Sequence, residues 1–316
     1  MRKTAVLANM VCVLMWGFSF ISLKVAVPVI PPMTLGAVRF AIAALILAIP
    51  CRLMSGEKPR VRDLPCLAGS GFAGVTLYFW GENNGVALIT ASEASIITAA
   101  IPVLTMTAEW FAARLFPGGE APRLGWRRWL GALISAAGVG LVARVSLALS
   151  GNITGYLYMG GAALCWVAYG FLTKPLFDRG RSQIYIVFWQ NCFGLLGFLP
   201  FAAMEHSRWT PPSLPVAGHV LFLAVCCSAL GYWLYAHALK GLGVSAAAAF
   251  INLIPVVTVI AGFCVLKERL SPLQWAGAAL AMAGVYLAVL PQRRVSPSPL
   301  PPGNDPPPPE KAGRRG

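Results

Sequence analysis

Charged residues are scarce in this sequence of 316 residues, because Asp, Glu, Lys and Arg together make up only 11% of it. A soluble globular protein carries about 25% of these residues, since its surface must be hydrated. Hydrophobic residues account for 57%, and the mean hydropathy is +0.69. The composition therefore argues against a soluble enzyme, and we expect no nucleic-acid partner. It predicts that lipid covers much of the surface.

Motifs for metal, nucleotide or nucleophile chemistry are also absent from the sequence. The eight cysteines form no Cys-x-x-Cys pair and have no histidine at metal-site spacing, so we interpret them as small apolar residues. The sequence has no His-Glu-x-x-His, Gly-x-Ser-x-Gly or Walker A motif. These absences predict a protein without a cofactor, a metal centre or an enzymatic activity. A pump driven by ATP would need a soluble nucleotide-binding domain, for which we find no segment.

Long apolar stretches recur along the chain, each about long enough to cross a bilayer as a helix. Breaks rich in Pro, Gly, Ser and Asn separate them, and abundant Gly and Ala within them predict close helix packing. The predicted spans lie near residues 5–27, 33–50, 64–88, 91–115, 126–145, 153–175, 183–203, 215–239, 243–266 and 272–291. We therefore predict an all-α integral membrane protein with ten transmembrane helices.

The basic residues predict the orientation of these helices. The formal net charge is +14, and with the amino terminus inside, 19 of the 25 Lys and Arg residues fall on the inner side. Four fall on the outer side and two lie within spans. Because positive residues accumulate on the cytoplasmic side of membrane proteins, we expect both termini in the cytoplasm. The predicted location is a bacterial inner (plasma) membrane.

The two halves of the sequence repeat each other. Trp16 and Lys24 recur as Trp166 and Lys174, at a shift of 150 residues. Further pairs in the same order are Pro50 with Pro200, Trp80 with Trp233, Pro102 with Pro255, Trp129 with Trp275, Gly131 with Gly277 and Gly138 with Gly284. Because each half has five predicted helices, the second half must cross the membrane in the opposite direction, as in many secondary transporters. We predict a first repeat at 1–147, a second at 148–292, and a disordered Pro-rich tail at 293–316.

Four motifs, in the same order along the chain, resemble those of a known family. They are Trp16-Gly17-Phe18-Ser19-Phe20 followed by Lys24; Pro32 followed by Arg39-Phe40; Ala94-Ser95-Ile96 before Pro102; and Lys267-Glu268-Arg269-Leu270 before Gly277 and Gly284. Over nearly all of residues 5–291 the chain is similar to the EamA family of the drug/metabolite transporter superfamily. One departure is that the first repeat has Arg114-Leu115 where the second has Lys267-Glu268, so the terminal Glu motif is degraded there.

This resemblance implies two pseudo-symmetric five-helix bundles around a central substrate cavity. It also implies that the substrate is a small metabolite, such as an amino acid or a nucleotide-related compound, and that it is usually exported. The resemblance further implies that a proton gradient or exchange drives the transport.

Charged residues within the spans mark candidate functional positions, because a charge in hydrocarbon costs about 2.5 kcal/mol or more. Lys24, Arg39 and Glu82 lie at compatible depth, toward the predicted outer side. They could clamp a substrate carboxylate and ammonium or form an outer gate. Alternatively, they could neutralise one another as a structural network, or Lys24 could reach the interface. Glu93 follows Thr90 at the spacing of a capping box, which predicts a helix cap.

Aromatic and hydrogen-bonding residues in the spans predict a box for a small metabolite, either aromatic or cationic. The alternative is that the Trp and Tyr residues belong to interfacial belts. His237 is a candidate proton carrier, with a packing role as the alternative. The candidate residues are Trp16, Ser19, Tyr78, Trp80, Asn83, Trp166, Tyr169, Gln190, Tyr232, Trp233, Tyr235 and His237.

Pro102 and Pro255 predict two symmetry-related helix kinks. Each proline removes a backbone hydrogen bond and displaces the carbonyl four residues earlier, at Thr98 or Ile251. In lipid, a freed carbonyl must face protein or a water-filled cavity. We therefore expect both kinks to line the transport pathway, with simple packing kinks as the alternative. Asn252, one turn before Pro255, could serve the broken backbone or a ligand.

These observations lead to one functional hypothesis and one alternative. We predict a secondary active transporter that exports a small metabolite, an amino acid or related compound, by alternating access coupled to protons or exchange. The alternative is an intramembrane enzyme that acts on a lipid or glycan head group. The expected partners are the small-molecule substrate and the lipid bilayer, and homodimerisation is left open.

Overall fold

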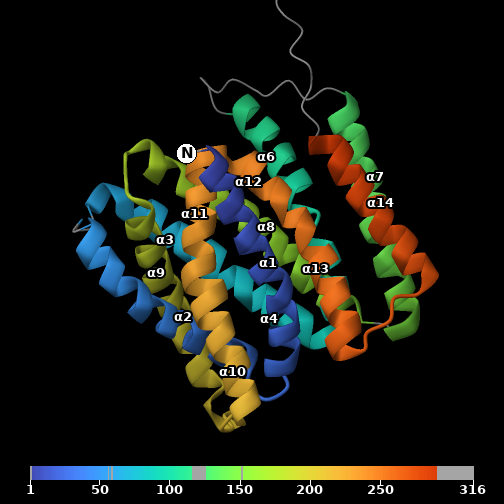
Figure 1. Cartoon of the computed structure of the whole chain (residues 1–316), viewed down its shortest axis with the longest axis horizontal. Helices are drawn as coiled ribbons and strands as arrows, with labels where there is room; N and C mark the ends of the chain where they lie inside the picture. The colour runs from blue at the N-terminus through green and yellow to red at the C-terminus, as the bar shows by residue number, and fades with distance from the viewer. Residues whose placement is uncertain (1, 56, 58–59, 116–125, 151, 290–316) are drawn as a thin grey trace, which may run out of the picture.

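The computed structural model describes residues 2–55, 57, 60–115, 126–150 and 152–289, and all regular elements within these ranges are helical (Figure 1). The α-helices are α1 (Arg2–Ala26), α2 (Pro32–Pro50), α3 (Leu64–Gly71), α4 (Tyr78–Leu88), α5 (Ala91–Thr98), α6 (Ile101–Leu115), α7 (Trp126–Ser150), α8 (Ile153–Asp178), α9 (Gln183–Met204), α10 (Leu214–Phe222), α11 (Gly231–Leu242), α12 (Val244–Ala249), α13 (Leu253–Ala261) and α14 (Pro272–Val289). Short 3-10 or π-helical segments join or continue them: η1 (Cys51–Ser55), η2 (Val61–Asp63), η3 (Phe72–Leu77), η4 (His206–Arg208), η5 (Leu223–Leu230), η6 (Phe250–Asn252) and η7 (Gly262–Leu266). The predicted tail at 293–316 lies outside the described residues.

Seven helical segments in the described part of the chain are long and apolar enough to cross a membrane. They are Lys3–Ala26, Pro32–Ser55, Ala91–Leu115, Ile153–Asp178, Gln183–Met204, Leu214–Leu242 and Ala246–Leu266, and Trp129–Val142 is a shorter apolar helix. The predicted spans near 64–88 and 272–291 are helical as well, in α3 to α4 and in α14. The prediction of an all-helical membrane protein is therefore confirmed, whereas the number of ten spans stays a prediction.

Helices from the two halves of the chain pack against each other through most of the bundle (Figure 1). α1 contacts α11 and α13, α2 pairs with α9, and α4 pairs with α8. α7 and α14 form a pair of their own at one side of the bundle. The main apolar core draws its buried residues from both halves, so any site in this core is built from residues far apart in the sequence.

The contact between α7 and α14 depends on glycine. A Cβ atom on Gly138 would lie 2.6 Å from the carbonyl oxygen of Gly277 and would also collide with the backbone nitrogen of Ala281. A Cβ atom on Gly284 would lie 2.6 Å from the carbonyl oxygen of Gly131. Because the atoms in the way belong to the backbone, they cannot rotate aside. The two helices therefore pack as closely as the small residues in the sequence predicted.

Two glutamates join the ends of α2 and α9 in a pseudo-symmetric way. Glu205 follows α9 and accepts hydrogen bonds at the start of α2, from the backbone nitrogen of Thr34 at 2.8 Å and its hydroxyl at 2.9 Å. Glu57 follows η1 and accepts a hydrogen bond from the backbone nitrogen of Ser182, the N-cap of α9, at 3.3 Å. Each carboxylate thus meets the unpaired amides and the positive dipole of a helix start.

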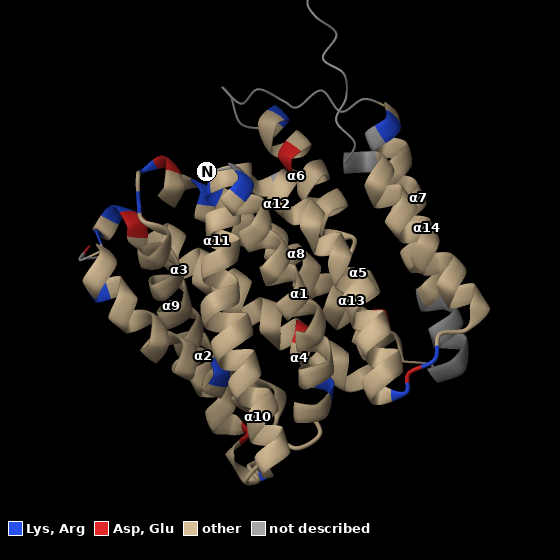
Figure 2. Ribbon diagram, viewed as in Figure 1, with Lys and Arg blue, Asp and Glu red and all other residues tan. Residues whose placement is uncertain are grey.

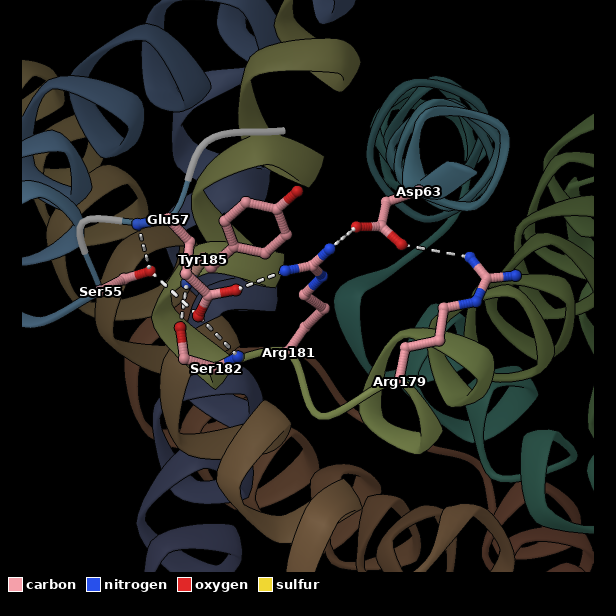
Figure 3. Close-up of polar contacts among 7 residues, drawn as sticks. All are labelled: Ser55, Glu57, Asp63, Arg179, Arg181, Ser182 and Tyr185. Atoms are coloured by element: carbon pink, nitrogen blue, oxygen red, sulfur yellow. Dashed lines mark hydrogen bonds and ion pairs between the residues drawn. The ribbon is translucent and has the colours of Figure 1, made fainter. Parts of the chain in front are cut away.

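A cluster of charged residues joins the segment after α2 to the turn between α8 and α9 (Figure 3). Arg181 donates to Glu57 at 3.0 Å and pairs with buried Asp63 at 2.6 Å, and Arg179 pairs with Asp63 at 3.3 Å. Burial by itself would raise the pKa of Glu57, but hydrogen bonds from Arg181 and Ser182 outweigh burial and lower the pKa from its ordinary value. The cluster therefore joins these two connecting segments through ion pairs.

Lys and Arg residues gather at the end of the bundle where the chain begins, which we call the amino-terminal end (Figure 2). Fewer of them lie at the opposite end. The folded chain therefore has a marked difference in charge between its two ends.

Candidate functional site

A narrow cavity lies where α1, α2, α4, α8 and α11 meet the breaks before α6 and α13. Its lining residues are Trp16, Ser19, Phe20, Arg39, Tyr78, Phe79, Glu82, Thr98, Ile101, Trp166, Tyr232, Ile251 and Ile254. The centre of a water molecule can reach only about 20 Å³ of this space. The cavity is thus nearly closed in this conformation, and its volume is well below the roughly 300–1,000 Å³ of a usual small-molecule site.

Two interrupted helices supply part of the cavity wall. The helix that contains Pro102 is broken between α5 and α6, and the helix that contains Pro255 tightens to the 3-10 turn η6 before α13. Thr98 and Ile251, each four residues before its proline, both line the cavity. The two breaks therefore lie at the cavity. The sequence analysis expected them to line the transport pathway.

Four aromatic rings form one wall of the cavity, which we call the aromatic wall. Trp166 of α8 lies at its centre and contacts one ring each from α1, α4 and α11. The ring centre of Trp166 lies 5.2 Å from that of Trp16, 4.9 Å from that of Tyr78 and 5.8 Å from that of Tyr232. The indole nitrogen of Trp16 donates to the carbonyl of Cys227 at 3.1 Å. Rings fixed in this way can hold an apolar side chain or a cationic group against their faces.

Arg39 is the one cation among the described residues that line the cavity, and its exposed fraction is only 2%. Its Nε donates to the hydroxyl of Ser228 at 2.9 Å, and its Cζ lies 4.3 Å from the ring centre of Phe79. Its Nη1 is buried and has no hydrogen-bond partner among the described residues. Because a buried guanidinium needs partners for its donors, Nη1 is available to an anionic group of a ligand.

Glu82 is the one carboxyl group among the described residues that line the cavity. It is buried, and the hydroxyl of Tyr78 donates to its Oε1 at 2.8 Å. Within the described residues, no ion pair joins Glu82 to Arg39 or to Lys24. The same residues contain no group of three His, Cys, Asp or Glu that could hold a metal ion. The cavity therefore offers one cation, one carboxylate and aromatic faces, an arrangement suited to binding a dipolar solute.

Comparison with known proteins assigns the chain to a family. The model of the EamA-like transporter family matches it twice, at residues 3–144 and 153–290. The chain belongs to the EamA-like transporter family. It is therefore a multi-pass membrane transporter of small metabolites rather than an enzyme, which confirms the family resemblance of its motifs. This membership decides against the alternative of an intramembrane enzyme.

Relatives of this EamA-like chain include proteins described as exporters. A probable terminal-alkyne amino-acid exporter of Streptantibioticus cattleyicolor is 30% identical over 285 residues, which cover 90% of this chain and 92% of that protein. A probable amino-acid metabolite efflux pump of Escherichia coli is 27% identical over 307 residues, which cover 91% and 95%. A solved crystal structure with 19% identity matches 93% of this chain and 100% of its own with a TM-score of 0.64, which shows a shared fold.

Lys24 does not line the cavity in this EamA-like fold, although the sequence places it at a similar depth to Arg39. Its Nζ donates to the carbonyl oxygens of Val86 and Ile89 at the end of α4, both at 2.8 Å. These carbonyls lack partners within the helix, so the ammonium caps the helix end. Lys24 therefore belongs neither to the predicted substrate clamp nor to the alternative network with Arg39 and Glu82.

The capping role predicted for Glu93 is confirmed. The side chain of Thr90 accepts a hydrogen bond from the backbone of Glu93, and the side chain of Glu93 accepts one from the backbone of Thr90. Glu93 thus belongs to the start of α5 and is not among the residues that line the cavity.

Trp80 and Asn83 lie on α4, like Glu82, but contribute to other contacts. Trp80 is 42% exposed, and its ring packs against Tyr158 at a centroid distance of 5.0 Å. Asn83 is buried and donates to the carbonyl of Pro32 at 2.7 Å, which ties α4 to the start of α2. Both residues were predicted at the substrate site, and the structure places both outside the cavity lining.

Gln190 and Tyr169 belong to a buried polar group beside the cavity. Gln190 donates to the hydroxyls of Ser70 and Thr173, both at 2.8 Å, and accepts from the hydroxyl of Tyr169 at 3.3 Å. The ring of Tyr169 also packs against Trp166 at 5.0 Å. Tyr169 therefore supports the aromatic wall from behind, and Gln190 joins α9 to α3 and α8.

Of the predicted site residues on α11, Tyr232 lines the cavity and the others do not. Tyr235 packs behind the wall, 5.1 Å from the ring centre of Trp16, and Trp233 is half-buried against the apolar core. His237 lies farther along the helix, with Nε2 3.3 Å from the hydroxyl of Thr4 in α1. The prediction of His237 as a proton carrier therefore has no support from the cavity geometry.

The smaller predicted polar residues lie at or beside the cavity. Ser19 lines it and donates to the carbonyl of Trp16 at 2.6 Å. Asn252 lies in η6 next to the lining residue Ile251, and its Oδ1 is buried without a partner in the described residues. This oxygen can accept a hydrogen bond if the break before α13 rearranges.

Several lining residues were not predicted because they are apolar. Phe20 and Phe79 are next to predicted residues in the sequence. Ile101 and Ile254 each directly precede one of the two helix-breaking prolines. The recurrence of Ile-Pro at 101–102 and 254–255 is a repeat signal that could have identified both isoleucines. Ser228, the partner of Arg39, gave no such signal, since it lies in an apolar run of another helix.

Proposed function

We propose that the chain is a secondary transporter that exports a small zwitterionic metabolite, an amino acid or a close analogue. The observation that carries this proposal is the cavity beside the aromatic wall, where Arg39 Nη1 and one carboxylate oxygen of Glu82 have no hydrogen-bond partner among the described residues. A zwitterion would give each buried charge an opposite charge, which such groups require in a water-poor interior. Its side chain would lie against Trp16, Trp166 and Tyr232.

The relatives support the same substrate class. The names of the proteins from S. cattleyicolor and E. coli describe an amino-acid exporter and an amino-acid metabolite efflux pump. Both are matched over nine tenths of their length. Export is therefore the favoured direction for this chain, with coupling to protons or to exchange.

We further propose ten transmembrane spans arranged as two inverted repeats, with both termini in the cytoplasm of a bacterial-type inner membrane. The two matches of the family model, one in each half, support the repeat. The opposed capping of α2 by Glu205 and of α9 by Glu57 supports the inversion. The gathering of Lys and Arg at the amino-terminal end supports the orientation, because positive residues stay on the cytoplasmic side.

Counterflow in proteoliposomes tests the substrate class. Vesicles filled with one unlabelled neutral amino acid, aliphatic or aromatic, should accumulate the same labelled compound from outside. For phenylalanine, we expect phenethylamine and 3-phenylpropionate to compete at least about tenfold more weakly, because each lacks one charged group that the cavity would bind. Equal competition by all three compounds, or no exchange of any neutral amino acid by folded protein, would show that the proposal is wrong.

Replacing Glu82 with glutamine keeps the side-chain size but removes its charge. We expect Glu82→Gln to lose transport driven by a pH gradient, with an acidic vesicle lumen, by about 100-fold, because a buried charge contact is worth about 3–5 kcal/mol. Expression and the thermal midpoint should change little. Asn84→Ala, two residues along the same helix, is the control and should keep wild-type rates. Wild-type pH-driven transport by Glu82→Gln would remove this residue from the site.

A further inference from the structure

The turn between α4 and α5, residues 88–92, is held by charged side chains from both halves of the chain. Lys24 in α1 donates to the carbonyls of Val86 and Ile89 at the end of α4. Glu268, after η7, accepts from the backbone nitrogens of Ala91 and Ser92 at 3.0 and 3.1 Å, at the start of α5. One cation thus pairs with free carbonyls and one anion with free amides. We call this turn with its two side chains the α4–α5 latch.

The repeat places a corresponding turn at the opposite end of the bundle, between α11 and α12 (Figure 1). Lys174 in α8 corresponds to Lys24 at the shift of 150 residues. Leu239 and Leu242 correspond to Val86 and Ile89 at the shift of 153, which also relates Trp80 to Trp233. The second turn therefore has the lysine and the helix end that an equivalent latch needs.

This second latch is not formed in the conformation described. Lys174 is exposed, and it donates no hydrogen bond within the described part of the chain. A cavity of about 200 Å³ lies between Lys174, Leu239 and Gly243 instead. Lys24, by contrast, is half-buried and makes two hydrogen bonds. The lysine thus holds the turn at one end of the bundle, whereas the corresponding turn at the other end is not held in this way.

The second turn has no acidic residue at the position that corresponds to Glu268. At the shift of 153, Glu268 corresponds to Leu115, whose exposed fraction is 73% and whose side chain cannot accept a hydrogen bond. The start of α12 at Gly243 has no side-chain cap. Of the two charged latch residues, only the lysine therefore has a counterpart at this turn.

We propose that Lys24 and Lys174 are paired gating residues of alternating access. Lys24 locks the α4–α5 turn in the conformation described here. Lys174 locks the α11–α12 turn in the alternative conformation, in which the Lys24 bonds are broken. This inference rests on the proposed transport function, because a lock at only one end at a time has a purpose only if the two ends open in turn. Each set of charge-assisted hydrogen bonds then stabilises one conformation against the other.

Hydrogen exchange of the full-length protein in nanodiscs, without substrate, tests this inference. The readout is the exchange rate of the amides at residues 88–95, which depends on how often the α4–α5 latch opens. Lys24→Met should raise this rate at least about tenfold, because it removes two charge-assisted bonds. Lys174→Met should lower it about tenfold, because it destabilises the conformation in which that latch is open. The double variant should return close to the wild-type rate.

The effect of Lys174→Met is the decisive result, because a residue with only a local role cannot protect amides at the other end of the bundle. Lys174→Arg keeps a donor and should keep the wild-type rate. Lys240→Met is the matched control: Lys240 lines the same cavity but corresponds to Ala87, so it should leave the rate at 88–95 unchanged.

An unchanged rate in Lys174→Met, or an equal slowing by Lys240→Met, would overturn the pairing of the two lysines. Because exchange is measured without substrate, these outcomes do not depend on the counterflow assay. Failure of counterflow with the expected exchange pattern would reject the substrate class alone.

Discussion

Replacing Arg39 with glutamine is expected to weaken amino-acid binding at least about 100-fold and to raise the half-saturating concentration in counterflow by the same factor. The guanidinium is the one cation among the described lining residues, and its Nη1 is buried without a partner. Removing one member of a buried charge pair costs about 3–5 kcal/mol, and each 1.4 kcal/mol is about tenfold in affinity. The half-saturating concentration in counterflow and the shift of the thermal midpoint by substrate both measure this loss.

Arg52→Gln makes the same chemical change at an exposed position on the segment that continues α2, and it should keep wild-type affinity. A second control is the compound that lacks a carboxylate. Phenethylamine should compete equally well with both Arg39→Gln and wild type, because it has no group for Arg39 to bind. Folded Arg39→Gln with wild-type affinity for the amino acid would contradict the assignment of Arg39 to the carboxylate.

Replacing Gly138 with alanine is expected to separate α7 from α14 and to destabilise the protein by about 1–3 kcal/mol, the usual cost of overpacking. The added methyl group would collide with the backbone of Ala281 and Gly277, which cannot rotate away. Gly140 lies on the same helix, and a Cβ atom there would meet nothing within 4 Å. Gly140→Ala is therefore the matched control and should unfold at the wild-type temperature in nanodiscs. Equal thermal midpoints for the two variants would show that α7 and α14 have room to move apart.

Features that depend on neighbouring residues could be predicted from the sequence. Apolar stretches identified the helices, because the length and hydropathy of a span are local properties. The Thr90–Glu93 capping box formed as expected, since its partners lie three residues apart. The breaks at Pro102 and Pro255 followed from the missing amide of proline. The recurrence of these prolines in both halves also indicated that they share one site.

The direction in which each side chain points could not be predicted in the same way. Trp16 lines the cavity, whereas Trp80 is exposed and packs against Tyr158, although both lie within apolar helices. In a soluble protein, the polar face of a helix marks its outside. In a membrane, lipid and protein interior are both apolar, so the pattern hardly distinguishes the two faces. Depth along the helix was therefore predictable, but rotation about its axis was not.

The sequence by itself determined that this protein is a helical membrane transporter of the EamA-like family. Hydropathy, charge bias and the order of motifs are properties of the linear sequence and do not depend on tertiary packing. Only the tertiary structure decided the roles of its few buried charges. Arg39 bonds to Ser228, 189 positions away, and its Nη1 has no partner within the described part of the chain, while Lys24 caps the end of α4, 62 positions away. Both cations lie in the same half of the sequence and the same predicted membrane region. Packing between distant helices determined the partners of both cations. These partners make Arg39 a candidate ligand-binding residue and Lys24 a candidate gating residue.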